Sequence, residues 1–170
     1  RDPEMSRGLG DVYKRQPVNT DGGHAPMLGG GLCTTLHDYM RFLDMIYHNG
    51  VFEEKQLLKP ETIHEMQANQ VGNAEVHPGE YVERALKKYH TGIYGLGEWR
   101  ELIDEATGEA YQISSPGWAG AYPWINKQDR VYGFFIAHVQ GSSQKEDGFS
   151  SFFGSPVISQ TVSNIISLKR

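Results

Sequence analysis

The sequence has little cysteine, no concentrated positive charge and no long apolar run. Cys33 is the single cysteine of 170 residues, which excludes an internal disulfide bond and a metal site built from several cysteines. The net charge is −5 and the basic residues form no block, so nothing favours nucleic acid as a partner. No apolar run approaches the length of a membrane-spanning helix. We therefore expect one globular domain, or part of one, with a packed core.

Metal and phosphate motifs are also missing. The seven histidines are scattered, and His64-Glu65 lacks the second histidine of a zinc helix motif. The triple glycine 29–31 is not followed by Gly-Lys-Ser/Thr, so it is not a phosphate-binding loop. We expect no metal and no cofactor, and we interpret the glycines as close backbone packing before a helix.

Residues 1–16 do not resemble natural protein sequence. They have no apolar period and no hydrophobic region of a signal peptide. Residues 6–16 resemble a translated transposase-type sequencing adapter along their whole length. We interpret residues 1–16 as a non-native, adapter-derived segment and expect the natural gene to have been cut at Pro17, with its N-terminal part missing.

Two helices are predicted early in the chain. Thr34 or Thr35 caps the first, and Asn49-Gly50 closes it in left-handed geometry. Pro60 suits the first position of the second helix. The apolar face of the first helix has helical spacing and comprises Leu36, Tyr39, Met40, Leu43, Ile46 and Tyr47.

Strand patterns follow. Gly92–Arg100 alternates like a strand, Thr107-Gly108 forms a turn, and Ala110–Ser114 is a second strand. An aromatic run ending at Asn126 and the segment 131–139 form a hairpin. A closing helix is expected to start at Ser155-Pro156. This helix should bury Ile158, Val162, Ile165 and Ile166. A short helix is possible over 81–88. The predicted layout is α+β with about four antiparallel strands. The order of these strands in the sheet is not assigned from the sequence.

Several segments, taken in order, resemble the beta-lactamase-related serine hydrolases, which include class C beta-lactamases, D-alanyl-D-alanine carboxypeptidases and related esterases. Gly29–Phe42 resembles the family's glycine-rich entry and following helix, and Leu57–Ile63 resembles the next helix start. Tyr94–Gly97 and the aromatic hairpin resemble two later strands. The resemblance covers nearly all of residues 29–140. It implies a three-layer α+β, beta-lactamase/transpeptidase-like fold, of which residues 17–170 are the C-terminal portion of a single domain.

The resemblance also implies a site. The family's nucleophile is the Ser of S-x-x-K, assisted by its Lys and by the Tyr of Y-x-N, and both motifs would lie upstream of this chain. The third motif is K-T-G, H-x-G or W-x-G on a strand that lines the cleft. The spacing to the aromatic strand places it at Ser115-Pro116-Gly117. A register shifted by three would place it at Trp118-Ala119-Gly120.

Carried over residue by residue, the backbone amide of Trp118 is the second donor of the oxyanion hole. Ser115, Pro116, Gly117 and Gly120 are the expected substrate-binding residues, and Gly117 lets the substrate lie against the strand. Ser115 stands where the family often has a cation that binds a substrate carboxylate. Because Ser supplies no charge, it favours a neutral ester or amide.

Two strings imitate the upstream motifs. Ser142-Ser143-Gln144-Lys145 fits S-x-x-K but lies in a polar stretch, and Tyr47-His48-Asn49 fits Y-x-N but ends a helix. We interpret them as a solvated loop and a helix terminus. Trp118 and Trp124 are expected either to pack in the core or to line a cleft.

The sequence thus predicts the C-terminal part of a serine hydrolase that acts through an acyl-enzyme on a small ester, amide or peptide. Without a nucleophile–base pair, this chain alone should be inactive. The alternative is a non-catalytic member of the fold that binds peptide or cell-wall fragments. A third possibility is that the chain does not fold alone, because its sheet would have exposed edges.

Overall fold

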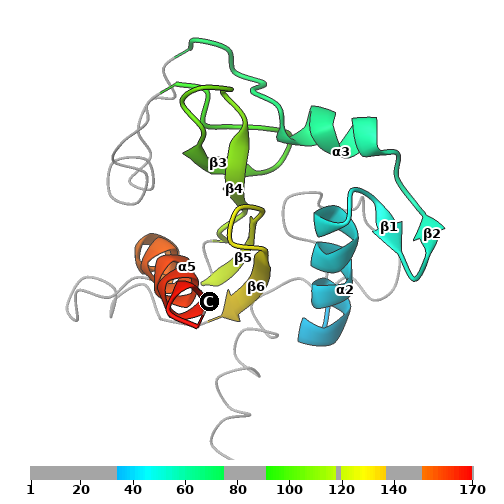
Figure 1. The fold of residues 1–170 in the computed structure, drawn as a ribbon, viewed down its shortest axis with the longest axis vertical. Coiled ribbons are helices and arrows are strands. Elements are labelled where there is room, and N and C mark those ends of the chain that lie inside the picture. The colour runs from blue at the N-terminus through cyan, green and yellow to red at the C-terminus, as the bar shows by residue number, and fades with distance from the viewer. Residues whose placement is uncertain (1–33, 75–90, 118–119, 137–150, 170) are drawn as a thin grey trace, which may run out of the picture. The chain divides into compact units, whose positions relative to one another are not determined.

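The computed structural model describes residues 34–74, 91–117, 120–136 and 151–169. The chain divides into two compact units, 1–35 and 36–170, and the second contains all the elements described below. In order these are α2 (Leu36–Tyr47), β1 (Val51–Phe52), β2 (Lys55–Gln56), α3 (Pro60–Gln67), β3 (Trp99–Ile103), β4 (Ala110–Ser114), β5 (Ala121–Asn126), β6 (Val131–Ile136) and α5 (Ser151–Ser167) (Figure 1).

The main sheet is a four-stranded antiparallel meander. Its order is β3-β4-β5-β6, so each strand pairs with its neighbour in sequence. This confirms the predicted set of about four antiparallel strands and the aromatic hairpin, which is β5 paired with β6. The second predicted strand, Ala110–Ser114, is β4 with the same bounds.

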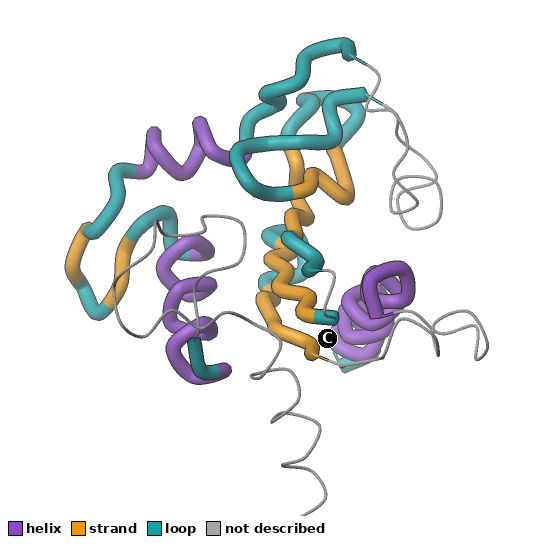
Figure 2. The backbone as a smooth tube through the Cα atoms, turned by 180° about the vertical axis from the view of Figure 1, so that it is seen from behind, coloured by secondary structure: helices purple, strands orange, loops and turns teal. Residues whose placement is uncertain are grey.

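The sheet separates two unlike layers. Because side chains alternate along a strand, Ile113 and Ile125 lie on one face, where they pack in a core with α2 and α3. Gln112 and Tyr122 lie on the other face, against α5. The two views agree that the strands run between α2 and α5 (Figure 2). The fold is therefore a three-layer α+β arrangement, as predicted.

The first helix begins at Leu36, directly after the two candidate cap residues, and its C-terminal end agrees with the prediction. Its C-terminus is closed by Asn49 and Gly50, whose φ angles of 54° and 89° are left-handed. A side chain at Gly50 would overlap the carbonyl of Leu58, which explains why glycine is needed there. One predicted core residue is wrong: Leu36 is 58% exposed, because it begins the helix beyond the edge of the packed face.

The predicted strand at Gly92–Arg100 is wrong in its bounds. The strand β3 begins only at Trp99, and Tyr94 contributes an isolated bridge to Trp99. Glycines interrupt the extended backbone, since Gly92 and Gly97 have φ angles of 66° and 78°. The amide of Gly95 bonds the carbonyl of Glu98 at 2.9 Å, which makes the segment a turn.

The closing helix also differs from its prediction. It begins at Ser151, so Pro156 lies inside the helix and not at its first position. The expected buried residue Ile165 is 48% exposed, whereas Ser159 and Ser163 are buried. For Ser159 the reason lies in the sheet, which presents the polar side chains of Gln112 and Tyr122 to this helix.

Several expectations fall outside the described residues: Cys33, the glycines 29–31, the helix at 81–88 and the string Ser142–Lys145. Within the described ranges, no helix combines the length and the apolar character that crossing a membrane requires.

Candidate functional site

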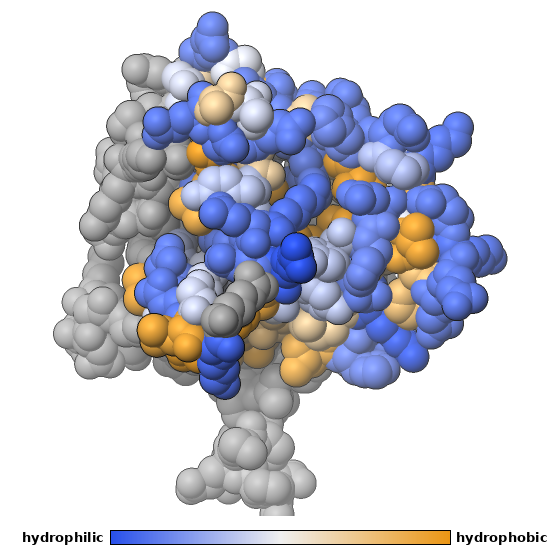
Figure 3. All heavy atoms as spheres, viewed as in Figure 1, coloured by the Kyte–Doolittle hydropathy of each residue, from blue (hydrophilic) through white to orange (hydrophobic). Residues whose placement is uncertain are grey.

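A cavity of about 270 Å³ lies between α2, the turn before β3 and the strands β4 and β5. Its wall is mostly apolar, and the exposed side chains of Phe42 and Leu96 contribute to it. Apolar residues also break the largely hydrophilic surface in the space-filling view (Figure 3). The polar side chains among the wall residues belong to Tyr39, Glu98, Ser114 and Ser115.

Ser115 brings the predicted third motif to this cavity. It follows β4 directly, and its amide continues the ladder by bonding the carbonyl of Pro123 at 3.2 Å. Its hydroxyl donates to the carbonyl of Gly97 at 3.1 Å. Ser115 is an exposed residue of the cavity wall, so a ligand in the cavity can reach it.

The other predicted substrate-binding residues lie past the cavity. Pro116, Gly117 and Gly120 are not among the wall residues. The amide of Gly117 bonds the carbonyl of Ala121 at 2.7 Å, and the amide of Gly120 bonds the carbonyl of Gly117 at 2.9 Å. These bonds close a tight connection between β4 and β5. Trp118, the predicted oxyanion donor, lies outside the described residues, and its role stays a prediction.

The sequence interpretation missed Glu98. This half-buried residue lines the cavity, and its Oε1 is buried without a hydrogen-bond partner among the described residues. Burial raises the pKa of Glu98 to about 7, although the positive charges of Lys127 and Arg100 oppose the shift. The available signal was a single carboxylate inside the glycine-rich apolar run 92–99.

On the opposite face, a buried carboxylate organises the strand that precedes the motif. Glu101 of β3 accepts hydrogen bonds from Gln112 at 2.7 Å and from Tyr122 at 2.8 Å, and Ser114 also donates to it. Burial and the charge of Glu101 raise the pKa of Tyr122 well above its usual value. Ser114 precedes Ser115, so these bonds fix the end of β4 where it meets the cavity.

The same network reaches α5. The hydroxyl of Ser159 lies 3.1 Å from both the Gln112 amide nitrogen and the Tyr122 hydroxyl. Asn126 donates to the side-chain oxygen of Gln112 at 2.9 Å. Buried polar groups are stable where they satisfy one another. We interpret this cluster as structural, because it joins three strands to a helix and does not line the cavity beside Glu98, apart from Ser114.

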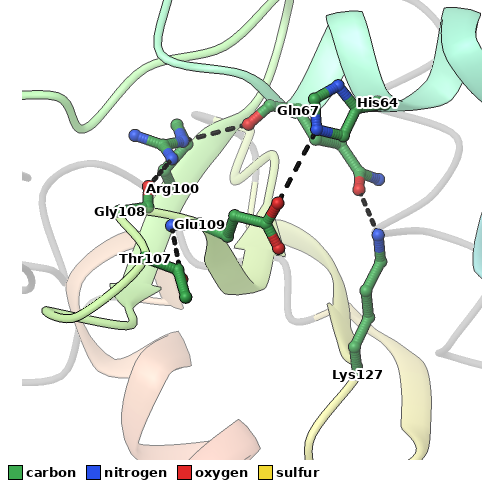
Figure 4. Close-up of polar contacts among 7 residues, drawn as sticks. All are labelled: His64, Gln67, Arg100, Thr107, Gly108, Glu109 and Lys127. Atoms are coloured by element: carbon green, nitrogen blue, oxygen red, sulfur yellow. Dashed lines mark hydrogen bonds and ion pairs between the residues drawn. The ribbon is translucent and has the colours of Figure 1, made fainter.

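A second cavity, of about 300 Å³, lies between α3 and the β3–β4 hairpin. Several of the residues that line it have polar or charged side chains, and Figure 4 shows the contacts among them. The two cationic side chains that line this cavity are already hydrogen-bonded to other residues of the protein. Arg100 donates to the carbonyls of Gln67, Gly92 and Gly108. Lys127 donates to the side chain of Gln67 at 2.5 Å. Because the guanidinium has protein acceptors from three segments, the cluster connects α3 to the sheet and is a poor candidate for binding an anion.

Two sequence alternatives are resolved within the described residues. Trp124 is 6% exposed and its ring stacks on Tyr122 with centroids 5.4 Å apart, and it also belongs to the wall of the cavity, so it is packed within the protein and lines the cavity as well. Tyr47-His48-Asn49 ends α2, and the ring of Tyr47 packs 5.3 Å from that of Tyr132. This string is therefore a helix terminus, as predicted.

Comparison with known proteins relates the chain to a solved structure. No family model matches the chain, and no curated protein matches it. A crystal structure from Bacteroides dorei DSM 17855, described as a "putative beta-lactamase", matches with 76% sequence identity and a TM-score of 0.78 over 89% of this chain. This chain has a beta-lactamase-like fold. It is related to the Bacteroides dorei protein and spans 45% of its length.

The beta-lactamase-like fold accounts for the arrangement around the cavity. The sheet, the helices on its two faces and the closing helix are the parts that the family resemblance implied. A chain that spans less than half of its relative presents only part of that relative's structure. The cavity wall containing Ser115 and Glu98 is the candidate site among the described residues.

Proposed function

We propose that this chain is the C-terminal part of a serine hydrolase that cleaves an ester or amide through an acyl-enzyme. The observation that carries the proposal is the match to the Bacteroides dorei protein at 76% identity over 89% of the chain. A cavity that meets the first residue of the predicted third motif supports it.

In this proposal the chain forms one wall of the site. The nucleophile and its base belong to the part of the longer protein that this chain does not span. The amide of Trp118 donates to the oxyanion that forms when the nucleophile attacks the carbonyl. Ser115 donates or accepts a hydrogen bond to the bound substrate from the rim of the cavity.

The charges in the cavity favour a substrate without a carboxylate. Ser115 cannot provide the positive charge that would bind one. Glu98 lines the same cavity and repels an anion when it is ionised. We therefore infer that the hydrolase acts on an ester or amide without a carboxylate more readily than on penicillins, which carry one.

The test requires the longer protein, made by joining this chain to the coding sequence that precedes it in its gene. We expect a fluorophosphonate probe to label one serine of an S-x-x-K motif upstream of residue 17, located by peptide mass spectrometry. The longer protein should hydrolyse p-nitrophenyl butyrate faster than nitrocefin, and residues 17–170 alone should hydrolyse neither. Labelling within residues 17–170 would contradict the proposal.

One observation favours a second candidate, a non-catalytic protein that binds peptide or cell-wall fragments. It is the absence of a cation at Ser115, where the family often uses one. In that case the longer protein would lack the Ser–Lys pair and would not be labelled. Its tryptophan fluorescence would change on addition of a muropeptide.

A further inference from the structure

We propose that the cavity beside Ser115 binds an organic ammonium group, with the carboxylate of Glu98 as its counter-ion. The proposal that this group belongs to the substrate rests on the function proposed above. The hydrolase would then select a cationic ester or amide. The binding site itself is argued from the described residues of this chain.

Among the described residues, one oxygen of the Glu98 carboxylate is left without a hydrogen-bond donor. That oxygen, Oε1, is buried, and none of the ion pairs between described residues includes Glu98. A buried charge without a partner is costly, so the protein gains when a cation supplies one. Folding has already removed much of the water around this carboxylate, so little further desolvation opposes binding.

The rest of the wall suits a cation surrounded by carbon. Tyr39 and Phe42 lie one turn apart on α2 and both line the cavity, with ring centroids 5.7 Å apart at an angle of 63°. Aromatic faces attract ammonium groups, and the attraction is largest where water is excluded. The remaining wall is mainly aliphatic: Leu43, Ile46, Met66, Leu96, Ile113 and Ile125. Methylated ammonium groups therefore fit better than a strongly hydrated metal ion.

The cationic side chains near Glu98 do not take the place of the proposed ammonium ligand. Arg100 of β3 and Lys127 after β5 act on Glu98 through space and lower its pKa. Both direct their donors to the acceptors of the second cavity, Arg100 to three carbonyls and Lys127 to Gln67. From α2, the titratable group facing the cavity is the Tyr39 hydroxyl, whose pKa burial raises. It therefore stays neutral at physiological pH.

The test uses two ligands of the same shape. Choline has a positively charged nitrogen bonded to three methyl groups. In 3,3-dimethyl-1-butanol an uncharged carbon takes the place of that nitrogen. Titration of the 170-residue chain, followed by NMR chemical shifts, should show about tenfold tighter binding of choline. Raising the pH from 6 to 8 should strengthen choline binding about tenfold, because the Glu98 carboxyl ionises over that range. Binding of the alcohol should not change.

Matched variants identify the group responsible. Glu98→Gln should abolish the preference for choline and its pH dependence. Glu61→Gln removes one negative charge from the exposed first turn of α3 and should leave both unchanged. Equal binding of the two ligands, no binding of either, or a preference that persists in Glu98→Gln would each overturn the proposal.

The outcomes separate this proposal from the proposed function. If choline binds with the expected preference and the longer protein is not labelled by a fluorophosphonate, the ammonium site stands and the hydrolase proposal fails. If the longer protein is labelled and the ligands bind equally, the hydrolase proposal stands and the ammonium site fails.

Discussion

The hydroxyl of Tyr132 on β6 donates a 2.6 Å hydrogen bond to the Asp44 carboxylate on α2, across 88 positions of sequence. This bond is the main reason that the pKa of Tyr132 is raised to about 12. Asp44 also lies 3.2 Å from the ring of His48 at the end of the helix. The contact fixes the C-terminal half of α2 to the sheet and thereby one wall of the cavity.

Removing this hydroxyl should destabilise the protein. Tyr132→Phe keeps the ring and leaves Asp44 without its donor, so we expect the free energy of unfolding in urea to fall by about 1–2 kcal/mol. Tyr94→Phe is the matched control, because the ring of Tyr94 packs on Trp99 and no hydrogen bond of its hydroxyl is present among the described residues. Equal losses in the two variants would contradict the assigned role of Tyr132.

Glu98 should impose a pH dependence on stability. Its pKa is about 7 in the folded protein, against 4.5 for a glutamate exposed to water, so between these values the folded state binds more protons than the unfolded state. The free energy of unfolding contributed by Glu98 therefore falls as the pH rises from about 4.5 to about 7, and is level above that range.

Glu98→Gln should remove this slope. The variant should be as stable as the wild type near pH 4.5 and more stable at pH 8, measured by urea unfolding across the range. The exposed-charge variant Glu61→Gln should retain the wild-type slope. An unchanged slope in Glu98→Gln would show that another group is responsible.

Gly133 leaves room for the ring of Trp124. These residues are paired across β5 and β6, and a Cβ at Gly133 would overlap the indole, 2.5 Å from its Cζ2. The ring of Tyr122 stacks on the indole and limits how far the indole can move away from Gly133. We expect Gly133→Ala to cost about 1–3 kcal/mol of unfolding free energy.

Gly117→Ala is the comparison for that variant. A Cβ there would meet Ala121 at 3.7 Å, an ordinary contact, so the change in stability should be within about 0.5 kcal/mol. A similar cost at both positions would show that overlap with the indole does not set the cost of Gly133→Ala.

The proposed oxyanion donor can be removed separately from the indole ring. In the longer protein, Trp118→Pro deletes the backbone N–H, whereas Trp118→Ala keeps it and deletes only the ring. We expect kcat for p-nitrophenyl butyrate to fall about 10²–10³-fold more in the proline variant. Circular dichroism of both variants shows whether the fold is retained. Equal activity in the two would contradict the assignment.

Local patterns predicted most of the fold. The spacing of Leu43 and Ile46 and the Asn49-Gly50 closure are signals within a few residues, and α2 follows them. The strand β4 is bounded by a Thr107-Gly108 turn and the polar Ser114-Ser115 pair, and its limits agree with the prediction. Such elements are specified by their own sequence.

The errors arise where contacts between residues far apart in the sequence determine which side chains are buried. Ser159 faces inward because the sheet offers Gln112 and Tyr122 as partners, and no pattern within the helix shows this. Glu98 follows a turn that is bonded to the end of α3, where the amide of Leu96 donates to the carbonyl of Met66 at 2.8 Å. The family resemblance predicted a substrate-binding motif at Ser115, yet it says nothing about Glu98, which follows a glycine with left-handed geometry at Gly97.

The serine-lined face of α5 has a consequence for how this helix docks. A helix with an apolar face can rotate or slide on an apolar sheet with little change in free energy, since one apolar contact replaces another. Ser159, in contrast, meets Tyr122 and Gln112 in one alignment only. A shift by a single residue would leave several buried donors and acceptors unpaired. The hydrogen bonds of Ser159 therefore favour one alignment of α5 on the sheet over neighbouring alignments, which would gain apolar contacts without these bonds.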